Sequence, residues 1–205
     1  MIPPVWNGAA FTILGEADVE NDVAQLEAYA GTRLPAAVRE WFRRGGDRRL
    51  AAVGSNLYPR LADVDMRFLE AGFLLLETDS QFCCRWVVEV AAADDDPPVF
   101  LVDPEDYACA SRERYADRFS DYTFACAWDA DLWSDDTSEA DFDQPLEVGA
   151  LDDLRRRLGA LPVTYGWAGN RSCDAVHRFG SPIGGERVAL AVQSSQVLWS
   201  LMSPA

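Results

Sequence analysis

Apolar residues recur at helical spacing near the start of the chain, and this pattern predicts two consecutive helices over residues 19–44. The second helix begins at Leu34-Pro35, because proline suits the first turn of a helix. It carries Trp41 and Phe42 on one apolar stripe and ends at Gly45-Gly46. We expect Trp41 and Phe42 to be buried anchors, because such a stripe needs a surface to cover it.

Short apolar runs further along the chain predict the surface that covers these helices. Residues 73–77, 82–90 and 98–102 are rich in aromatic, β-branched and other apolar side chains, and turn residues or prolines separate them. We therefore expect an antiparallel sheet that includes these strands. Helical spacing is weaker over residues 61–70 and clear again over residues 111–127, which predicts further helices beside the sheet.

The last third of the chain changes character. Residues 134–149 are acidic and contain no basic residue, so we interpret them as a solvated linker. A short helix is predicted over residues 151–158, and the strand-like runs that follow are 164–168, 175–179, 187–192 and 197–202. The pattern thus predicts an α+β fold, with helices packed on an antiparallel sheet and a C-terminal extension made of a helix and a β-meander. We expect a core at 1–133 and, after the linker, a subdomain at 150–205 that packs on it.

The charge balance narrows the choice of partners. The chain has 34 acidic and 18 basic residues, which gives a formal net charge of −16. Lysine and arginine hold phosphate backbones and anionic membrane surfaces, so neither a nucleic acid nor a membrane is an expected partner. A basic protein fits better. With 49% hydrophobic residues, the chain has ample material for a folded core.

Nothing in the sequence predicts export or membrane insertion. The first basic residue is Arg33, so the start lacks the positive flank of a signal peptide. The longest strongly apolar run, at 73–76, is too short for a membrane span. The cysteines are odd in number and irregularly spaced, which does not predict a disulfide framework. We therefore expect a cytoplasmic protein.

The residues that could carry chemistry form no convincing constellation. His177 is the only histidine, and we interpret it as a partly exposed strand residue without a catalytic role. Cys83 and Cys84 are adjacent on a predicted strand, so they should face opposite sides. The aspartate runs lack the spacing of a calcium loop, and the glycine pairs lack that of a nucleotide loop. We expect no catalytic residue, no metal and no cofactor.

Three motifs, taken in order, resemble the SUKH superfamily, which includes fungal cell-wall-assembly regulators and many bacterial immunity proteins. The motifs are Leu26-Glu27-Ala28-Tyr29 through Leu34-Pro35 to Trp41-Phe42 and Gly45-Gly46, Glu77-Thr78-Asp79-Ser80-Gln81 leading to Trp86, and Asp96-Pro97-Pro98-Val99-Phe100. The resemblance covers residues 19–133. It departs from the family at Arg44, where an asparagine commonly precedes the glycine. The part from Leu151 onwards looks like the extension that some bacterial members carry.

The resemblance implies a binding role. Bacterial members are typically encoded beside secreted or contact-delivered toxins, which they neutralise by binding alone. An acidic inhibitor suits a nuclease toxin, because such a toxin must be basic where it holds phosphates. We therefore expect an immunity-type protein, without enzymatic activity, that binds a cognate basic toxin of a polymorphic toxin system. The alternative is a general protein-interaction or regulatory module of the same fold with an endogenous partner.

The acidic stretch supplies the first candidates for the partner surface. Its carboxylates have no arginine nearby in the sequence, so their field should reach a basic partner over about 8 to 10 Å at physiological salt. The candidates are Asp135, Asp136, Glu139, Asp141 and Asp143. The second place to look is the run Asp94, Asp95 and Asp96.

Overall fold

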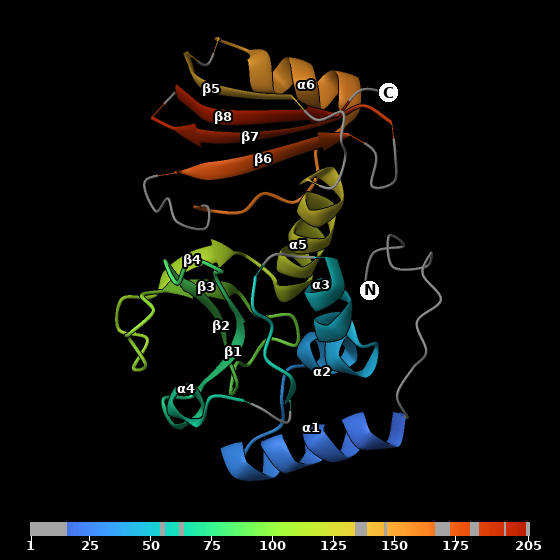
Figure 1. The fold of residues 1–205 in the computed structure, drawn as a ribbon, viewed down its shortest axis with the longest axis vertical. Helices are drawn as coiled ribbons and strands as arrows, with labels where there is room; N and C mark the ends of the chain where they lie inside the picture. The colour runs from blue at the N-terminus through green and yellow to red at the C-terminus, as the bar shows by residue number, and fades with distance from the viewer. Residues whose placement is uncertain are drawn as a thin grey trace.

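The described part of the chain folds as two antiparallel sheets with helices around them, and helix α5 (Phe119–Trp133) lies between the sheets (Figure 1). A computed structural model describes residues 16–53, 56–61, 64–133, 139–145, 147–166, 173–180, 185–194 and 196–203. The predicted α+β class is confirmed, with helices packed on an antiparallel sheet and a C-terminal helix and meander.

The first sheet is built from strands in sequence order, each antiparallel to the next. Its strands are β1 (Phe73–Thr78), β2 (Arg85–Glu89), β3 (Val99–Val102) and β4 (Glu113–Ala116). The helices described before this sheet are α1 (Glu16–Ala30), α2 (Ala36–Arg43), α3 (Gly46–Val53) and α4 (Met66–Glu70). The strands predicted at 73–77 and 98–102 are confirmed, whereas the strand predicted over 82–90 begins only at Arg85, because residues 82–84 belong to the turn. Of the helix predicted over 61–70, residues 62 and 63 lie outside the described residues, and the helix present there is α4.

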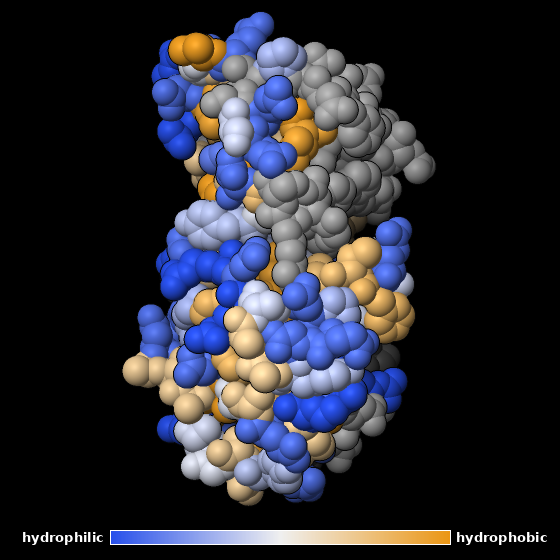
Figure 2. Space-filling view, turned by 90° about the vertical axis from the view of Figure 1, so that its left-hand side faces the viewer, coloured by the Kyte–Doolittle hydropathy of each residue, from blue (hydrophilic) through white to orange (hydrophobic). Residues whose placement is uncertain are grey.

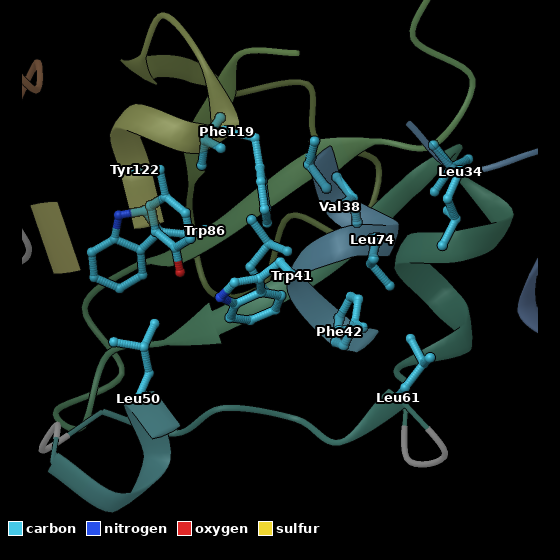
Figure 3. Close-up of a cluster of buried hydrophobic side chains, with 14 of the residues drawn as sticks. Leu34, Val38, Trp41, Phe42, Leu50, Leu61, Leu74, Trp86, Phe119 and Tyr122 are labelled. Atoms are coloured by element: carbon cyan, nitrogen blue, oxygen red, sulfur yellow. The ribbon is translucent and has the colours of Figure 1, made fainter. Parts of the chain in front are cut away.

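Trp41 and Phe42 of α2 are buried anchors, as predicted, with 1% and 3% of their surface exposed. The Trp41 ring meets Phe42 and Phe119 edge-on, with ring centroids 4.7 and 5.6 Å away. Figure 3 shows these rings together with Leu74 of β1 and Trp86 of β2. Helices α1, α2, α3 and α5 thus cover one face of the first sheet, and the core lies between them.

The glycine pair after α2 does not end the helical region, because α3 begins at Gly46. Gly45 has a φ of 66°, a left-handed conformation that turns the chain between the two helices. A Cβ atom on Gly46 would overlap the indole of Trp41. The pair therefore provides a tight turn and a close approach, whereas the sequence pattern indicated only a helix end.

The helix predicted over residues 111–127 is wrong in its first part, where the chain forms β4 before α5 begins. Tyr115, Phe119 and Tyr122 are all buried, at spacings that suit one helix face. Tyr115 nevertheless lies on β4, which pairs with β3 on one side. On its other side, the backbone N–H of Tyr165 donates to the Tyr115 carbonyl oxygen at 2.7 Å. Main-chain pairing on both sides therefore outweighs the local helical pattern.

Helix α5 contributes to the cores of both halves of the molecule. Phe119 and Tyr122 belong to the core of the first sheet. The side chains that pack against the second sheet are Phe124, Trp128 and Leu132. Because apolar residues lie on both sides of it, α5 has little amphipathic character.

The second sheet contains one strand in a stretch that the sequence pattern indicated as a linker. Its strands, in spatial order, are β5 (Glu139–Pro145), β8 (Gln196–Ser203), β7 (Arg187–Gln193) and β6 (Ala175–Gly180). Strand β5 pairs antiparallel with β8, from Glu139 opposite Met202 to Pro145 opposite Gln196. Residues 134–149 are therefore not a linker throughout. Main-chain hydrogen bonds define this pairing, so an acidic run can still form an edge strand.

Helix α6 (Ala150–Leu158) covers the face of the second sheet opposite α5. Along β7, Val188 and Leu190 belong to the cluster against which the leucines of α6 pack. Ala189 and Ala191, which alternate with them, belong to the cluster formed with α5. The second sheet is therefore enclosed between two helices.

The predicted C-terminal helix and strands are confirmed with one exception. The structure contains the predicted helix and three of the predicted strands as α6, β6, β7 and β8. Of the strand predicted over 164–168, Thr164 forms an isolated bridge with Val176, and residues 167 and 168 lie outside the described residues. Among the described helices, none combines the length and the apolar character needed to cross a bilayer.

Candidate protein-binding site

The tip of the hairpin between β1 and β2 has a tightly fixed backbone. The Asp79 carboxylate accepts hydrogen bonds from the backbone N–H groups of Gln81 and Cys83, at 2.9 and 3.2 Å. The Phe82 N–H donates to the Asp79 carbonyl oxygen at 2.9 Å, and the Asp79 N–H donates to that of Cys84 at 3.0 Å. A single buried aspartate therefore organises the whole turn.

Phe82 is held in an unfavourable backbone conformation and yet points into solvent. Its φ is 58°, a left-handed value that costs a side-chain-bearing residue roughly 1 to 3 kcal/mol. The residue is 57% exposed, so burial within this chain offsets only part of that cost. Strain of this kind at an exposed aromatic residue is typical of a binding site.

A second exposed apolar residue lies beside the hairpin. Leu57, which is 52% exposed, forms a two-hydrogen-bond bridge with Thr78, at 2.9 and 2.8 Å. Next to it, the Asn56 side-chain oxygen accepts a hydrogen bond from the Ser80 N–H at 3.1 Å. We use the name hairpin site for Leu57, Phe82 and the backbone that joins them.

A buried carboxylate holds the hairpin site from beneath. Glu77, the last but one residue of β1, is 3% exposed. One of its oxygens accepts hydrogen bonds from the Asn56 amide at 2.6 Å and the Tyr58 hydroxyl at 2.9 Å. The other accepts from the Tyr122 hydroxyl at 2.7 Å, with the Cys126 thiol at 3.8 Å. Glu77 thus ties the Asn56–Tyr58 segment to β1 and α5.

The electrostatics of this network are dominated by burial. Burial raises the pKa of Glu77 above its ordinary value, although its hydrogen-bond donors oppose the shift. Burial and the neighbouring Glu77 also raise the pKa values of Tyr58, Tyr122 and Cys126. The phenols and the thiol therefore stay protonated at neutral pH. The network is a set of hydrogen-bond donors around the Glu77 carboxyl group. Because Glu77 is buried, a substrate could not reach this carboxyl group.

Exposed carboxylates lie at the same end of the sheet as the hairpin tip. Thr78 is opposite Arg85, and Arg85 is opposite Val102, so the connection from β3 to β4 starts beside the tip. That connection opens with Asp103 and leads to Glu113 at the start of β4, and both are exposed. The hairpin site therefore combines exposed apolar groups with nearby negative charge.

The structure places the predicted acidic residues of the linker only in part. Asp135 and Asp136 lie outside the described residues. Glu139, Asp141 and Asp143 lie on β5, where Glu139 is opposite Met202 of β8 and their side chains are outside the description. Their role in binding stays a prediction.

The second predicted run, Asp94 to Asp96, forms hydrogen bonds to the starts of two helices. The Asp96 carboxylate accepts hydrogen bonds from the N–H and the hydroxyl of Ser120, at 2.8 and 2.6 Å, and so caps the start of α5. The Asp95 carbonyl oxygen accepts from the Ala37 N–H at the start of α2, at 2.8 Å. The side chains of Asp94 and Asp95 are exposed and that of Asp96 is partly buried, and the role of this run in partner contact stays a prediction.

The other chemical candidates from the sequence have ordinary surroundings. His177 is half-buried on β6 and stacks near Phe179, with ring centroids 6.3 Å apart. Burial lowers the pKa of His177. Cys83 is exposed and Cys84 is buried, although both precede β2 and do not lie on the predicted strand. Within the described ranges, no three His, Cys, Asp or Glu side chains are grouped to hold a metal ion.

The positive charges of the protein are largely used internally. Most arginines among the described residues form ion pairs with carboxylates: Arg39, Arg43, Arg44, Arg67, Arg114, Arg118, Arg155, Arg156, Arg157, Arg178 and Arg187. With a net charge of −16, the surplus that remains is carboxylate. On the face shown in Figure 2, hydrophilic residues cover most of the described surface, and hydrophobic ones form small separate groups.

Sequence reasoning missed both apolar residues of the hairpin site. Phe82 was assigned to a strand, and an aromatic residue after turn chemistry gives no sign of a left-handed backbone. Leu57 lies outside every predicted element, which was the one available signal that its apolar side chain had another use. Comparisons with known proteins found no matching family, no matching curated protein and no matching solved structure.

Proposed function

We propose that this chain is an immunity-type binding protein, of the SUKH kind that its motifs resemble, which neutralises a cognate basic toxin by direct binding. The observation that carries the proposal is the hairpin site. A strained, exposed Phe82 is held by buried Asp79 and Glu77 at an acidic end of the sheet. Such an arrangement suits an aromatic anchor for a protein partner.

The charge of the chain supports a basic partner. The net charge of −16 sets the sign of the long-range field, whichever carboxylates the arginines pair with. A field of this sign accelerates association with a basic protein and weakens as salt is added. A nuclease toxin is basic where it holds phosphates, so an acidic inhibitor competes directly with the nucleic acid.

The surroundings of Glu77 favour binding over catalysis. A general acid or base must reach the proton that it transfers. Glu77 is 3% exposed and its oxygens are occupied by Asn56, Tyr58 and Tyr122. Its role is to hold the backbone that presents Phe82.

The test uses the domain that a toxin gene would supply. The C-terminal domain of a large secreted protein encoded immediately upstream is purified in an inactivated form, and its association with this chain is followed by interferometry at low and high salt. We expect binding that weakens with salt and that becomes about tenfold weaker for Phe82→Ala. Val148→Ala, at a fully exposed apolar residue outside the hairpin site, is the matched control.

Two outcomes would overturn the assignment. If the upstream domain does not bind, it is not the cognate toxin of this chain. That result would favour the alternative function, a regulatory module with an endogenous partner. Binding that is equally strong for Phe82→Ala and for Val148→Ala would move the contact away from the hairpin site.

A further inference from the structure

A hollow with an apolar floor lies at the end of the first sheet opposite the hairpin site, between α1 and the segment that leads into α4. Its volume is about 260 Å³. Leu26, Leu61 and Leu69 line it, and all three belong to the buried core, so its floor is rigid. We use the name α1–α4 groove for this hollow.

The size of the α1–α4 groove indicates the kind of occupant. Small-molecule pockets commonly measure about 300 to 1,000 Å³, and this groove is smaller. At its rim, Tyr29 is 56% and Met66 is 38% exposed. Tyrosine is enriched at binding hot spots, and methionine adapts its shape to a partner side chain. The groove therefore suits one apolar anchor side chain of a protein.

The charge around the α1–α4 groove indicates what should flank that anchor. Asp22 lines the groove and makes no ion pair with any residue in the described ranges. Glu70 is exposed and accepts a hydrogen bond from the Tyr29 hydroxyl at 3.3 Å. The nearby Arg67 pairs with Asp65 at 2.7 Å and stacks over a tyrosine ring. Arg67 and Asp65 together therefore add no net charge to the rim. The rim is therefore acidic.

We propose that the α1–α4 groove binds an apolar side chain of the partner that is flanked by lysine or arginine, with Asp22 and Glu70 pairing to the cation. This inference rests on the proposed function for the identity of the partner. Strand β1, which separates the groove from the hairpin site, has six residues and spans about 20 Å. One basic partner of ordinary size can therefore cover both sites.

The first experiment tests the groove without any toxin. The chain is labelled at its methyl groups and titrated with acetyl-Arg-Leu-Arg-amide, and acetyl-Glu-Leu-Glu-amide serves as the matched probe. We expect the basic peptide to shift the Met66 and Leu69 methyl resonances in a saturable way, and the acidic peptide to shift them much less. Equal shifts with both peptides, or shifts elsewhere only, would overturn the inference.

The second experiment uses the inactivated C-terminal domain of the secreted protein that is encoded immediately upstream. Met66→Glu should weaken its binding about tenfold, and Met202→Glu, at a methionine of equal exposure on β8, should not. Asp22→Asn is a milder surface change that should weaken binding without altering the fold. If the domain binds and none of these changes matters, the groove inference is wrong. If the domain does not bind but the basic peptide does, the toxin assignment fails and the groove remains.

Discussion

The guanidinium of Arg178 on β6 forms a paired contact with the carboxylate of Asp129 on α5, with nitrogen–oxygen distances of 2.8 and 2.5 Å. Arg178 has no exposed side-chain surface, and it also donates to the Thr164 hydroxyl at 3.0 Å. This buried ion pair joins the second sheet to the helix that completes the first core.

Removing one partner of that pair should be costly. Asp129→Asn leaves the Arg178 cation buried without its counter-charge, which should lower the free energy of unfolding by about 3 kcal/mol. Asp153→Asn breaks the exposed pair with Arg156 and should cost below about 1 kcal/mol. Denaturant titration of both variants measures the difference, and equal costs would contradict a structural role for the buried pair.

The close approach of Gly46 to Trp41 predicts a coupled pair of substitutions. Gly46→Ala should lower the free energy of unfolding by about 1 to 3 kcal/mol, because the new Cβ overlaps the indole. Trp41→Ala alone should cost about 3 to 5 kcal/mol, since the ring is fully enclosed. In the double variant the alanine at 46 has room, so the two costs should not add. Strict additivity in thermal and denaturant unfolding would rule out this contact.

Two substitutions at Phe82 separate backbone strain from side-chain contact. Both Phe82→Ala and Phe82→Gly remove the exposed ring and should weaken partner binding equally. Glycine accepts a left-handed backbone, so Phe82→Gly should be more stable than Phe82→Ala by about 1 kcal/mol. Chemical denaturation gives the stability difference, and a more stable alanine variant would show that the turn is not strained.

The buried carboxyl of Glu77 predicts a pH dependence of stability. Because burial raises the pKa of Glu77 above 4.5, the folded protein binds this proton more tightly than the unfolded chain. The contribution of Glu77 is therefore fully present below its ordinary pKa and is lost as the pH rises through the raised value. The free energy of unfolding of the wild type should fall over that range more steeply than that of Glu77→Gln. Parallel pH profiles of the two proteins would show that the Glu77 pKa is not raised by folding.

The elements that the sequence predicted well are those whose pattern and packing agree. Trp41 and Phe42 form one stripe on α2, and that stripe is the face that the core covers. The spacing of Tyr115 to Phe119 and Tyr122 suits a helix, whereas Tyr115 lies on β4, which pairs with β3, and its carbonyl oxygen accepts from Tyr165. The acidic composition of β5 gave no sign of a strand, although its backbone pairs with β8.

The candidate site was less accessible to sequence reasoning for a related reason. The acidity of the chain could be counted, and it directed attention to Asp96, whose carboxylate is bound to Ser120 at the start of α5. The conformation of Phe82 depends on hydrogen bonds to Asp79 and on the Asn56 segment, which is distant in sequence. Such a site exists only once the fold has brought its parts together.

Because α5 packs against both sheets, the chain cannot be divided next to α5 into two stable fragments. A fragment that stopped after α5 would carry Phe124, Trp128 and Leu132 without the sheet that covers them. This apolar stripe would be exposed to solvent, so the fragment would self-associate or be degraded. A fragment that began after α5 would lack the helix that covers one face of its sheet. The two halves are therefore expected to be inherited, expressed and unfolded as one unit.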